Sequence, residues 1–120
     1  GSKHFVNNLP PLAIKKIIGM MSIDMVGSGK NLYVGNMQRS NNWFTEWIRF
    51  QGLRLGYPVF LFNAGVGSDH MAFEIKGIPV AYIEWYKDNN YHTKEDTYDK
   101  LQIQNLEITG EIIIASILNL

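Results

Sequence analysis

The chain has 120 residues, of which 46% are hydrophobic and 18% charged, and its 11 basic and 11 acidic residues cancel. This composition indicates a single globular domain and excludes a disordered chain, a basic nucleic-acid-binding surface and an acidic tail. The absence of cysteine excludes disulfides, thiolate zinc ligands and cysteine nucleophiles. The apolar runs are too short for a transmembrane segment, and no signal peptide is visible. We therefore expect neither nucleic acid nor a membrane as a partner.

Segments with strand character alternate along the chain with segments of helical periodicity. Runs rich in β-branched and aromatic residues predict strands at 17–26, 31–36, 59–62 and 78–85. Capping residues and apolar spacing predict helices at 2–9, with Ser2 as its N-cap, and at 41–55, 68–77 and 102–118. The last helix has an apolar side formed by Ile103, Leu106, Ile113, Ile114 and Ile117. The alternation predicts an α/β fold with three layers, in which helices cover both faces of a mostly parallel sheet.

Asp24 is the one acidic residue within the apolar run 17–26, and it lies near the C-terminal end of that run. An acid inside an apolar strand is costly unless it is paired or bound to a metal, and open α/β sheets build their sites at the carboxyl ends of strands. The alternative is a carboxylate that caps a nearby loop or helix. Position alone does not decide between the two.

His92 lies in the polar loop after the last predicted strand, directly after Tyr91. A loop histidine is more often a surface residue than a ligand. Asp96 follows four residues later, and a zinc-bound imidazole usually donates its other N–H group to a carboxylate or a carbonyl. The choice is therefore between a metal ligand supported by Asp96 and a solvated turn.

Asp69 stands at the start of a predicted helix, in the tripeptide Ser68–His70. The commonest role for such a residue is to cap the helix, because an acid is stabilised near the positive end of the helix dipole. The functional alternative is that Asp69 faces a site and binds a substrate amine or a group that supports the site.

Five short stretches, taken in order, resemble the di-zinc aminopeptidases of metallopeptidase family twenty-eight, whose relatives include glutaminyl cyclases and glutamate carboxypeptidases. The stretches are Gly1–Val6, Ser22–Gly27, Gly67–His70 with Phe73, Gly77–Val80, and Tyr91–Thr93 with Asp96–Thr97. They run from the first residue to the final helix, so the resemblance covers the whole chain. Each stretch is weak alone, and their common order is what makes the resemblance specific.

The resemblance implies a site with two zinc ions, which share a bridging aspartate and a water molecule, beside a glutamate that acts as general base. Such a pair of ions polarises the scissile carbonyl and generates a hydroxide near neutral pH. By motif match, Asp24 corresponds to an aspartate ligand of one zinc and His92 to a histidine ligand of the other. Tyr91 matches a residue that contacts the tetrahedral intermediate, and Asp69 matches a carboxylate near the base.

The chain departs from the family pattern at its first residues. The family's His-x-Asp motif, bridging aspartate and Glu-Glu pair all lie upstream of the Gly-Ser with which this chain begins, and Gly1-Ser2 is either native or a cloning scar. No catalytic residue is therefore expected in this chain, which keeps one ligand for each zinc, whereas a catalytic zinc normally has three protein ligands. Zinc binding by this chain alone is expected to be weak or absent.

The resemblance thus predicts the C-terminal portion of an aminopeptidase that removes N-terminal residues from peptides, with a sheet that is incomplete relative to the family's fold. This chain alone is expected to be inactive, and to associate with a copy of itself or with a complementary N-terminal fragment. The family favours an extracellular or cell-surface location. Two alternatives stay open: a non-enzymatic α/β interaction module, and a two-chain enzyme in which a partner supplies the missing ligands.

Overall fold

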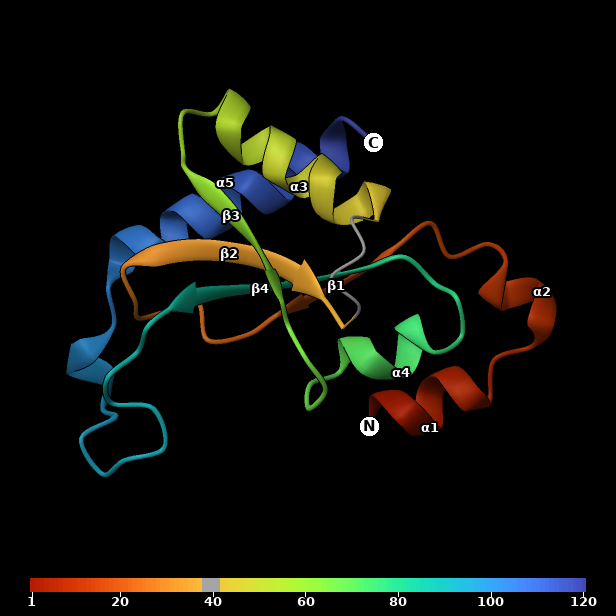
Figure 1. Cartoon of the computed structure of the whole chain (residues 1–120), viewed down its shortest axis with the longest axis horizontal. Helices are drawn as coiled ribbons and strands as arrows, with labels where there is room; N and C mark the ends of the chain where they lie inside the picture. Colours follow the sequence, from red (N-terminus) through yellow and green to blue (C-terminus); the bar gives the residue numbers. More distant parts are fainter. Residues whose placement is uncertain (38–41) are drawn as a thin grey trace.

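The computed structural model describes residues 1–37 and 42–120, and it contains one sheet in the order β1-β4-β2-β3 (Figure 1). The strands are β1 (Met20–Ile23), β2 (Asn31–Asn36), β3 (Val59–Asn63) and β4 (Val80–Tyr86). β1 pairs with β4 in parallel and β2 pairs with β3 in parallel, whereas β2 and β4 are antiparallel. Two of these three pairings are parallel, so the prediction of a mostly parallel α/β sheet is confirmed, and the sheet is open.

Helices cover both faces of the sheet, which gives the predicted three layers (Figure 1). α3 (Trp43–Arg54) and α5 (Ile103–Leu118) lie on one face, and α1 (Ser2–Asn7) and α4 (His70–Glu74) lie on the other. The short helix α2 (Pro11–Ile14) precedes β1, and a 3₁₀ turn, η1 (Tyr98–Lys100), precedes α5. In the described parts of the chain, none of the helices is both long and apolar enough to cross a membrane.

Each face of the sheet has its own hydrophobic cluster, because side chains alternate between the two faces along a strand. The larger cluster lies under α3 and α5 and consists of Leu32, Val34, Phe44, Ile48, Val59, Ala81, Ile83, Trp85 and Ile112. The smaller cluster lies under α1 and α4 and consists of Val6, Ala72, Phe73, Ile78 and Val80. The smaller cluster includes only the first residue of β4, so the rest of that face is left to the candidate site described below.

Several predicted boundaries differ from the structure at element ends. The predicted strand 17–26 is a strand only over Met20–Ile23; beyond it Met25 has a φ of 54°, which is not strand backbone, although its carbonyl still accepts a hydrogen bond from the Trp85 N–H group at 3.3 Å. Gly1, not Ser2, is the N-cap of α1, and its cap makes no side-chain hydrogen bond. The predicted helix 41–55 begins at Trp43 in the structure, and residue 41 lies outside the described residues.

Most of the predicted apolar side of the last helix faces outward, contrary to the usual expectation that such a stripe is buried, although Ile113 packs against the larger cluster. Ile103, Ile114 and Ile117 are each more than half exposed. The helix instead buries Asn105, Thr109, Ile112 and Ser116. The polar groups on this inner side are satisfied: Trp85 Nε1 donates to Thr109 Oγ1 at 2.9 Å, Asn105 Nδ2 donates to a backbone carbonyl and Ser116 Oγ donates to another. Buried polar groups cost little when they are paired in this way.

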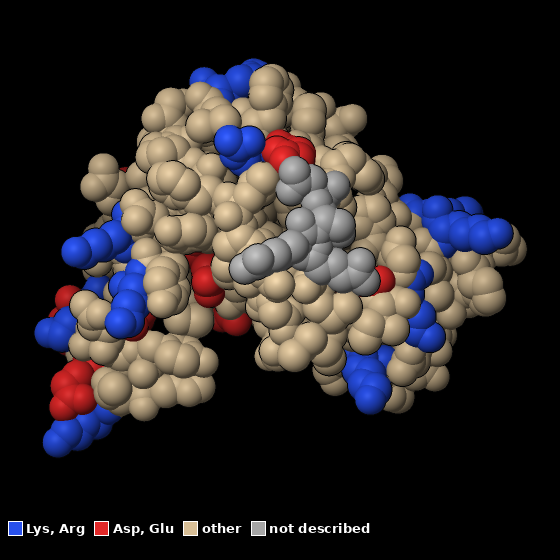
Figure 2. Space-filling model, in the orientation of Figure 1, with Lys and Arg blue, Asp and Glu red and all other residues tan. Residues whose placement is uncertain are grey.

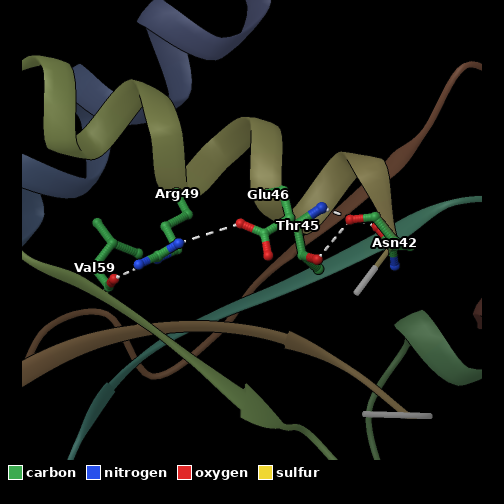
Figure 3. Close-up of polar contacts among 5 residues, drawn as sticks. All are labelled: Asn42, Thr45, Glu46, Arg49 and Val59. Atoms are coloured by element: carbon green, nitrogen blue, oxygen red, sulfur yellow. Dashed lines mark hydrogen bonds and ion pairs between the residues drawn. The ribbon is translucent and has the colours of Figure 1, made fainter. Parts of the chain in front are cut away.

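Asn42 caps the start of α3, where Figure 3 shows its contact with Thr45, and it also bonds to the sheet. Its Oδ1 accepts hydrogen bonds from the backbone N–H groups of Phe44 and Thr45 at 3.0 and 2.9 Å, and its Nδ2 donates to the carbonyl of Val80 at 2.9 Å. Loss of an asparagine N-cap typically costs about 1–2 kcal/mol. We expect Asn42→Ala to lower the free energy of unfolding by about 2 kcal/mol, as measured by urea denaturation.

A matched control for this variant lies one turn further along α3. Glu46 and Arg49 form an exposed ion pair at 3.3 Å, and Arg49 Nε also donates to the Val59 carbonyl (Figure 3). Exposed ion pairs contribute about 0–1 kcal/mol, so Glu46→Gln should change stability by less than about 0.5 kcal/mol. Equal losses in Asn42→Ala and Glu46→Gln would contradict the assigned role of the cap.

Candidate metal and substrate site

Asp24 follows β1 directly, at the carboxyl end of that strand. Its backbone N–H donates to the Ile83 carbonyl at 3.1 Å and so extends the ladder with β4 by one bond. Its Oδ2 atom accepts hydrogen bonds from Ser68 Oγ at 3.5 Å and from Tyr82 Oη at 3.4 Å. The side chain is exposed, and its partners are two hydroxyl groups rather than the N–H groups of a helix. These contacts favour the site interpretation of Asp24 over the capping one.

His92 lies in the loop between β4 and η1, and its ring stacks on the ring of Tyr91 with a centroid separation of 3.8 Å. Its backbone has a φ of 56°, and Met25, next to Asp24, has a φ of 54°. Non-glycine residues rarely adopt this left-handed conformation, and those that do are concentrated at functional sites. His92 therefore has a strained backbone conformation itself, and Asp24 lies next to a residue, Met25, that has one.

Asp24 and His92 line the same cavity, which has a volume of about 700 Å³. Its walls come from the ends of β1 and β4, the loop before α4 and the loop after β4; the lining residues include Met25, Ser68, Tyr82, Glu84, Tyr86, Asp88 and Tyr91. A smaller cavity of about 310 Å³ adjoins these residues, since Asp24, Met25, Asp88, Tyr91 and His92 line both. Figure 2 shows acidic side chains in the recess between the loop after β4 and the body of the molecule.

Two side chains that line the larger cavity, Tyr82 and Glu84, have raised pKa values. Burial raises the pKa of the Tyr82 hydroxyl, and the nearby carboxylates of Glu84 and Asp24 raise it further. Burial also raises the pKa of the Glu84 carboxyl, while a hydrogen bond from Tyr82 opposes that shift. Tyr82 therefore stays a neutral hydrogen-bond donor, and its hydroxyl is shared between the two carboxylates.

The remaining predicted site residues lie in different places. Asp96 lines the smaller cavity together with His92, and Tyr91 lines both cavities. Asp69 is the N-cap residue of α4, makes no side-chain capping bond, and is absent from the lining of either cavity. His70 is fully buried, with Nε2 3.1 Å from the Gly65 carbonyl oxygen.

Among the residues of the cavity wall that sequence reasoning missed are Ser68, Tyr82 and Glu84. Tyr82 and Glu84 were counted as part of a buried strand. The signal that could have found Glu84 is the same one that drew attention to Asp24, namely an acid within an apolar run.

The donor atoms present suit zinc in kind, although not in number. Zinc is bound by histidine nitrogen and by carboxylate oxygen, and Asp24 and His92 supply one of each to the same cavity. Across residues 1–37 and 42–120, no group of three or more histidine, aspartate or glutamate side chains is arranged to hold a metal ion. The chain therefore fits part of a zinc site.

Comparison with known protein families identifies the family of this chain. The sequence model of "Peptidase family M28" matches residues 1–117 of the chain. The chain belongs to peptidase family M28. This confirms the resemblance drawn from the five short stretches, and it makes zinc the metal of the family to which the chain belongs.

Individual relatives of the M28 chain are bacterial aminopeptidases. Aminopeptidase YwaD of Bacillus subtilis (strain 168) is 27% identical over 127 residues, which cover 98% of this chain. A solved structure of a zinc aminopeptidase from Bacillus subtilis superposes with a TM-score of 0.90 at 26% identity, over 99% of this chain. An aminopeptidase from Aneurinibacillus sp. strain AM-1 gives a TM-score of 0.87 at 31% identity, over 98% of this chain.

The chain spans only a minor part of these relatives. It covers 28% of YwaD, 32% of the Bacillus subtilis structure and 29% of the Aneurinibacillus structure. The fold and the family are thus shared over nearly the whole of this chain, while most of each relative has no counterpart in the 120 residues.

Proposed function

We propose that this chain is the C-terminal part of a zinc-dependent aminopeptidase that removes N-terminal residues from peptides, and that it is inactive by itself. The observation that carries the proposal is the shared cavity: Asp24 and His92, the two residues that match family ligands, line it from two separate segments of the chain. Family membership over residues 1–117 and the likeness to zinc aminopeptidases support the same reading.

In the proposed site, Asp24 would hold one zinc ion and His92 the other, and such a pair would supply an activated water and Lewis-acid polarisation of the substrate carbonyl. Tyr82 and Ser68 orient the Asp24 carboxylate through its Oδ2 atom. Asp96 lies on the same cavity wall as His92 and is proposed to support its imidazole. Tyr91 stacks on that imidazole and restricts its orientation.

The proposed inactivity of the isolated chain is supported by what the described residues supply. They contain no group of three metal-binding side chains, whereas a catalytic zinc normally has three protein ligands. In this proposal the remaining ligands and the general base come from the part of the domain that the relatives carry beyond the matched region. The test is hydrolysis of aminoacyl p-nitroanilides by this chain and by a longer protein that contains it with the His-x-Asp and Glu-Glu motifs.

The alternative function is a non-enzymatic α/β module that keeps the peptidase fold for partner binding. One observation favours it: each face of the four-stranded sheet has its own buried cluster, so the chain has a core without further residues. The two proposals differ in what a longer protein does, since only the first predicts that adding the upstream motifs creates peptidase activity.

A further inference from the structure

We propose that Glu84 and the aromatic side chains around it form a subsite for a cationic side chain, and that the enzyme therefore prefers peptides that begin with lysine or arginine. This inference rests on the proposed aminopeptidase function, and it names the substrate class. It is carried by the position of Glu84, the rings beside it, its lack of an ion-pair partner and the cavity that it shares with Asp24 and His92.

Glu84 projects from the face of β4 that the helices leave largely open. Ala81, Ile83 and Trp85 belong to the cluster under α3 and α5, so Glu84 points to the opposite face. In the antiparallel ladder Glu84 lies directly across from Tyr33 on β2. Side chains of directly opposed residues lie close together, which places the carboxylate next to the tyrosine ring.

Three aromatic rings surround the carboxylate in a hollow of about 370 Å³, which is lined by Tyr33, Phe62, Asn63, Glu84 and Tyr86. The ring of Tyr33 lies 5.6 Å from that of Phe62 at 65° and 6.1 Å from that of Tyr86 at 89°, as measured between centroids and planes. Rings set at steep angles to one another present both faces and edges to one space. The faces of aromatic rings attract ammonium and guanidinium groups.

A glycine holds this arrangement in place. A Cβ atom at Gly35 would lie 2.6 Å from the ring of Phe62 and 2.3 Å from the Phe62 carbonyl oxygen. Because Gly35 has no side chain, the Phe62 ring can lie against the backbone of β2, beside Tyr33. The hollow is therefore built from fixed strand positions and not from a loop.

The charge of Glu84 has no counterion within the described residues. The ion pairs found there involve Glu46, Glu95 and Asp99, and none includes Glu84. The neighbours of Glu84 are the Tyr82 hydroxyl and a second carboxylate, Asp24. Lys87 borders the larger cavity, but its side chain is exposed and makes no ion pair there. A half-buried carboxylate without a counterion is costly even when a hydroxyl group donates to it, and a bound cation would reduce that cost.

The hollow adjoins the cavity of the proposed metal site. Glu84 and Tyr86 line both the hollow and the larger cavity that contains Asp24 and His92. A substrate whose first peptide bond lies near Asp24 and His92 therefore has its N-terminal side chain within the same space as Glu84. Lysine and arginine both carry their charge at the end of an apolar stem, which suits a carboxylate surrounded by aromatic rings.

The same carboxylate could bind the α-ammonium group of any peptide, so the experiment must separate these two cations. We would titrate the ¹⁵N-labelled chain with lysine amide and with norleucine amide, which has the same α-ammonium group and no ε-ammonium group. Chemical-shift changes in two-dimensional NMR spectra report binding without any need for metal or turnover. The same spectra show whether each variant is folded.

We expect lysine amide to bind about tenfold more tightly than norleucine amide, with the largest shifts at Tyr33, Phe62 and β4. Glu84→Gln should remove this preference, whereas Glu107→Gln, an exposed change on α5, should leave it intact. Equal binding of the two amides, or a lysine preference that survives in Glu84→Gln, would overturn the proposal. Equal binding that is lost in Glu84→Gln would assign the carboxylate to the α-ammonium group and would also overturn it.

Failure of the proposed function gives a different result. If a longer protein hydrolyses no aminoacyl substrate while this chain still binds lysine amide through Glu84, the peptidase assignment fails and the cation site stands. If the longer protein hydrolyses leucyl and norleucyl substrates with no preference for lysyl ones, and Glu84→Gln leaves the ratio of their kcat/KM values unchanged, the cation site fails and the peptidase assignment stands.

Discussion

His92→Ala and Asp24→Ala are each expected to lower the kcat/KM of the proposed longer aminopeptidase by at least about a hundredfold. Loss of a residue that only supports a metal ligand typically costs 10–100-fold, so loss of a ligand itself should cost at least as much. Both residues line the cavity in which the proposed chemistry occurs. The measurement is the initial rate of leucine p-nitroanilide hydrolysis with zinc in excess.

His4→Ala is the matched control for this experiment, because His4 is an exposed histidine on α1, on a different segment from the cavity walls. Its rate should stay within about twofold of the parent. The 120-residue chain alone should show no hydrolysis at all, with or without zinc. Robust turnover by the short chain, or full activity in His92→Ala, would contradict the assignment of ligands and of the missing base.

The second large effect is expected on self-association, which we predict for the isolated chain through the outer side of α5. We name this surface the α5 stripe: it consists of Ile103, Leu106, Gly110, Ile114 and Ile117, spaced three or four residues apart. Its four large side chains are between 41% and 69% exposed. A Cβ atom at Gly110 would meet nothing within 4 Å, so another helix can approach closely at the middle of the stripe.

The β1 edge of the sheet is a second surface that could recruit another chain. β1 is an edge strand that pairs only with β4 within the described residues, and exposed strand edges recruit other chains. Soluble monomers rarely leave large contiguous apolar patches exposed. The zero net charge of the chain adds no overall repulsion between copies. We therefore expect a second copy of the chain to cover the α5 stripe when no other part of the proposed enzyme is present.

Light scattering coupled to size exclusion should show a dimer at micromolar concentration. The double variant Ile114→Lys/Ile117→Lys should raise the dissociation constant at least tenfold, since burying one isoleucine side chain contributes about 1.5–3 kcal/mol. Leu12→Lys is the control, because Leu12 is 73% exposed on α2 and lies outside the α5 stripe. A stable wild-type monomer would show that the chain is self-sufficient and would favour the module alternative.

The sequence predicted the class and order of the elements well, because strand and helix periodicities are local properties. β2, for example, has the predicted bounds, Asn31–Asn36. Element ends were less accurate, since they depend on caps and pairing partners: β1 is shorter than the apolar run 17–26 because only Met20–Ile23 lie in register with β4, and Met25 leaves the strand conformation with a φ of 54°.

The orientation of α5 could not be predicted from its own residues. An apolar stripe shows that one side of a helix avoids water, but the side that packs on the sheet is decided by the neighbours. Here Trp85 on β4 donates its indole N–H group to Thr109, and Trp47 on α3 donates to the Ser116 carbonyl, so the more polar side packs inward. Neither partner is local in sequence.

The candidate site was predictable only in part, for a related reason. Asp24 and His92 were singled out individually, and the structure brings them to one cavity, although their role as ligands stays a prediction. Glu84 was not predicted as a site residue because the hollow that it lines also needs Tyr33 and Phe62. These residues come next to Glu84 only through the strand order β4-β2-β3. For Asp69 the sequence left a capping role and a site role open; it lines neither cavity that contains Asp24 and makes no side-chain capping bond.

The most direct test of the central claim is the zinc content of the longer protein and of its two ligand variants, measured by mass spectrometry after exhaustive dialysis. Asp24 and His92 are assigned to different ions, so the account predicts about two zinc ions per chain in the parent and about one in each of Asp24→Ala and His92→Ala. His4→Ala should retain two. Two tightly held ions in both ligand variants would contradict the claim that this chain supplies one ligand to each zinc.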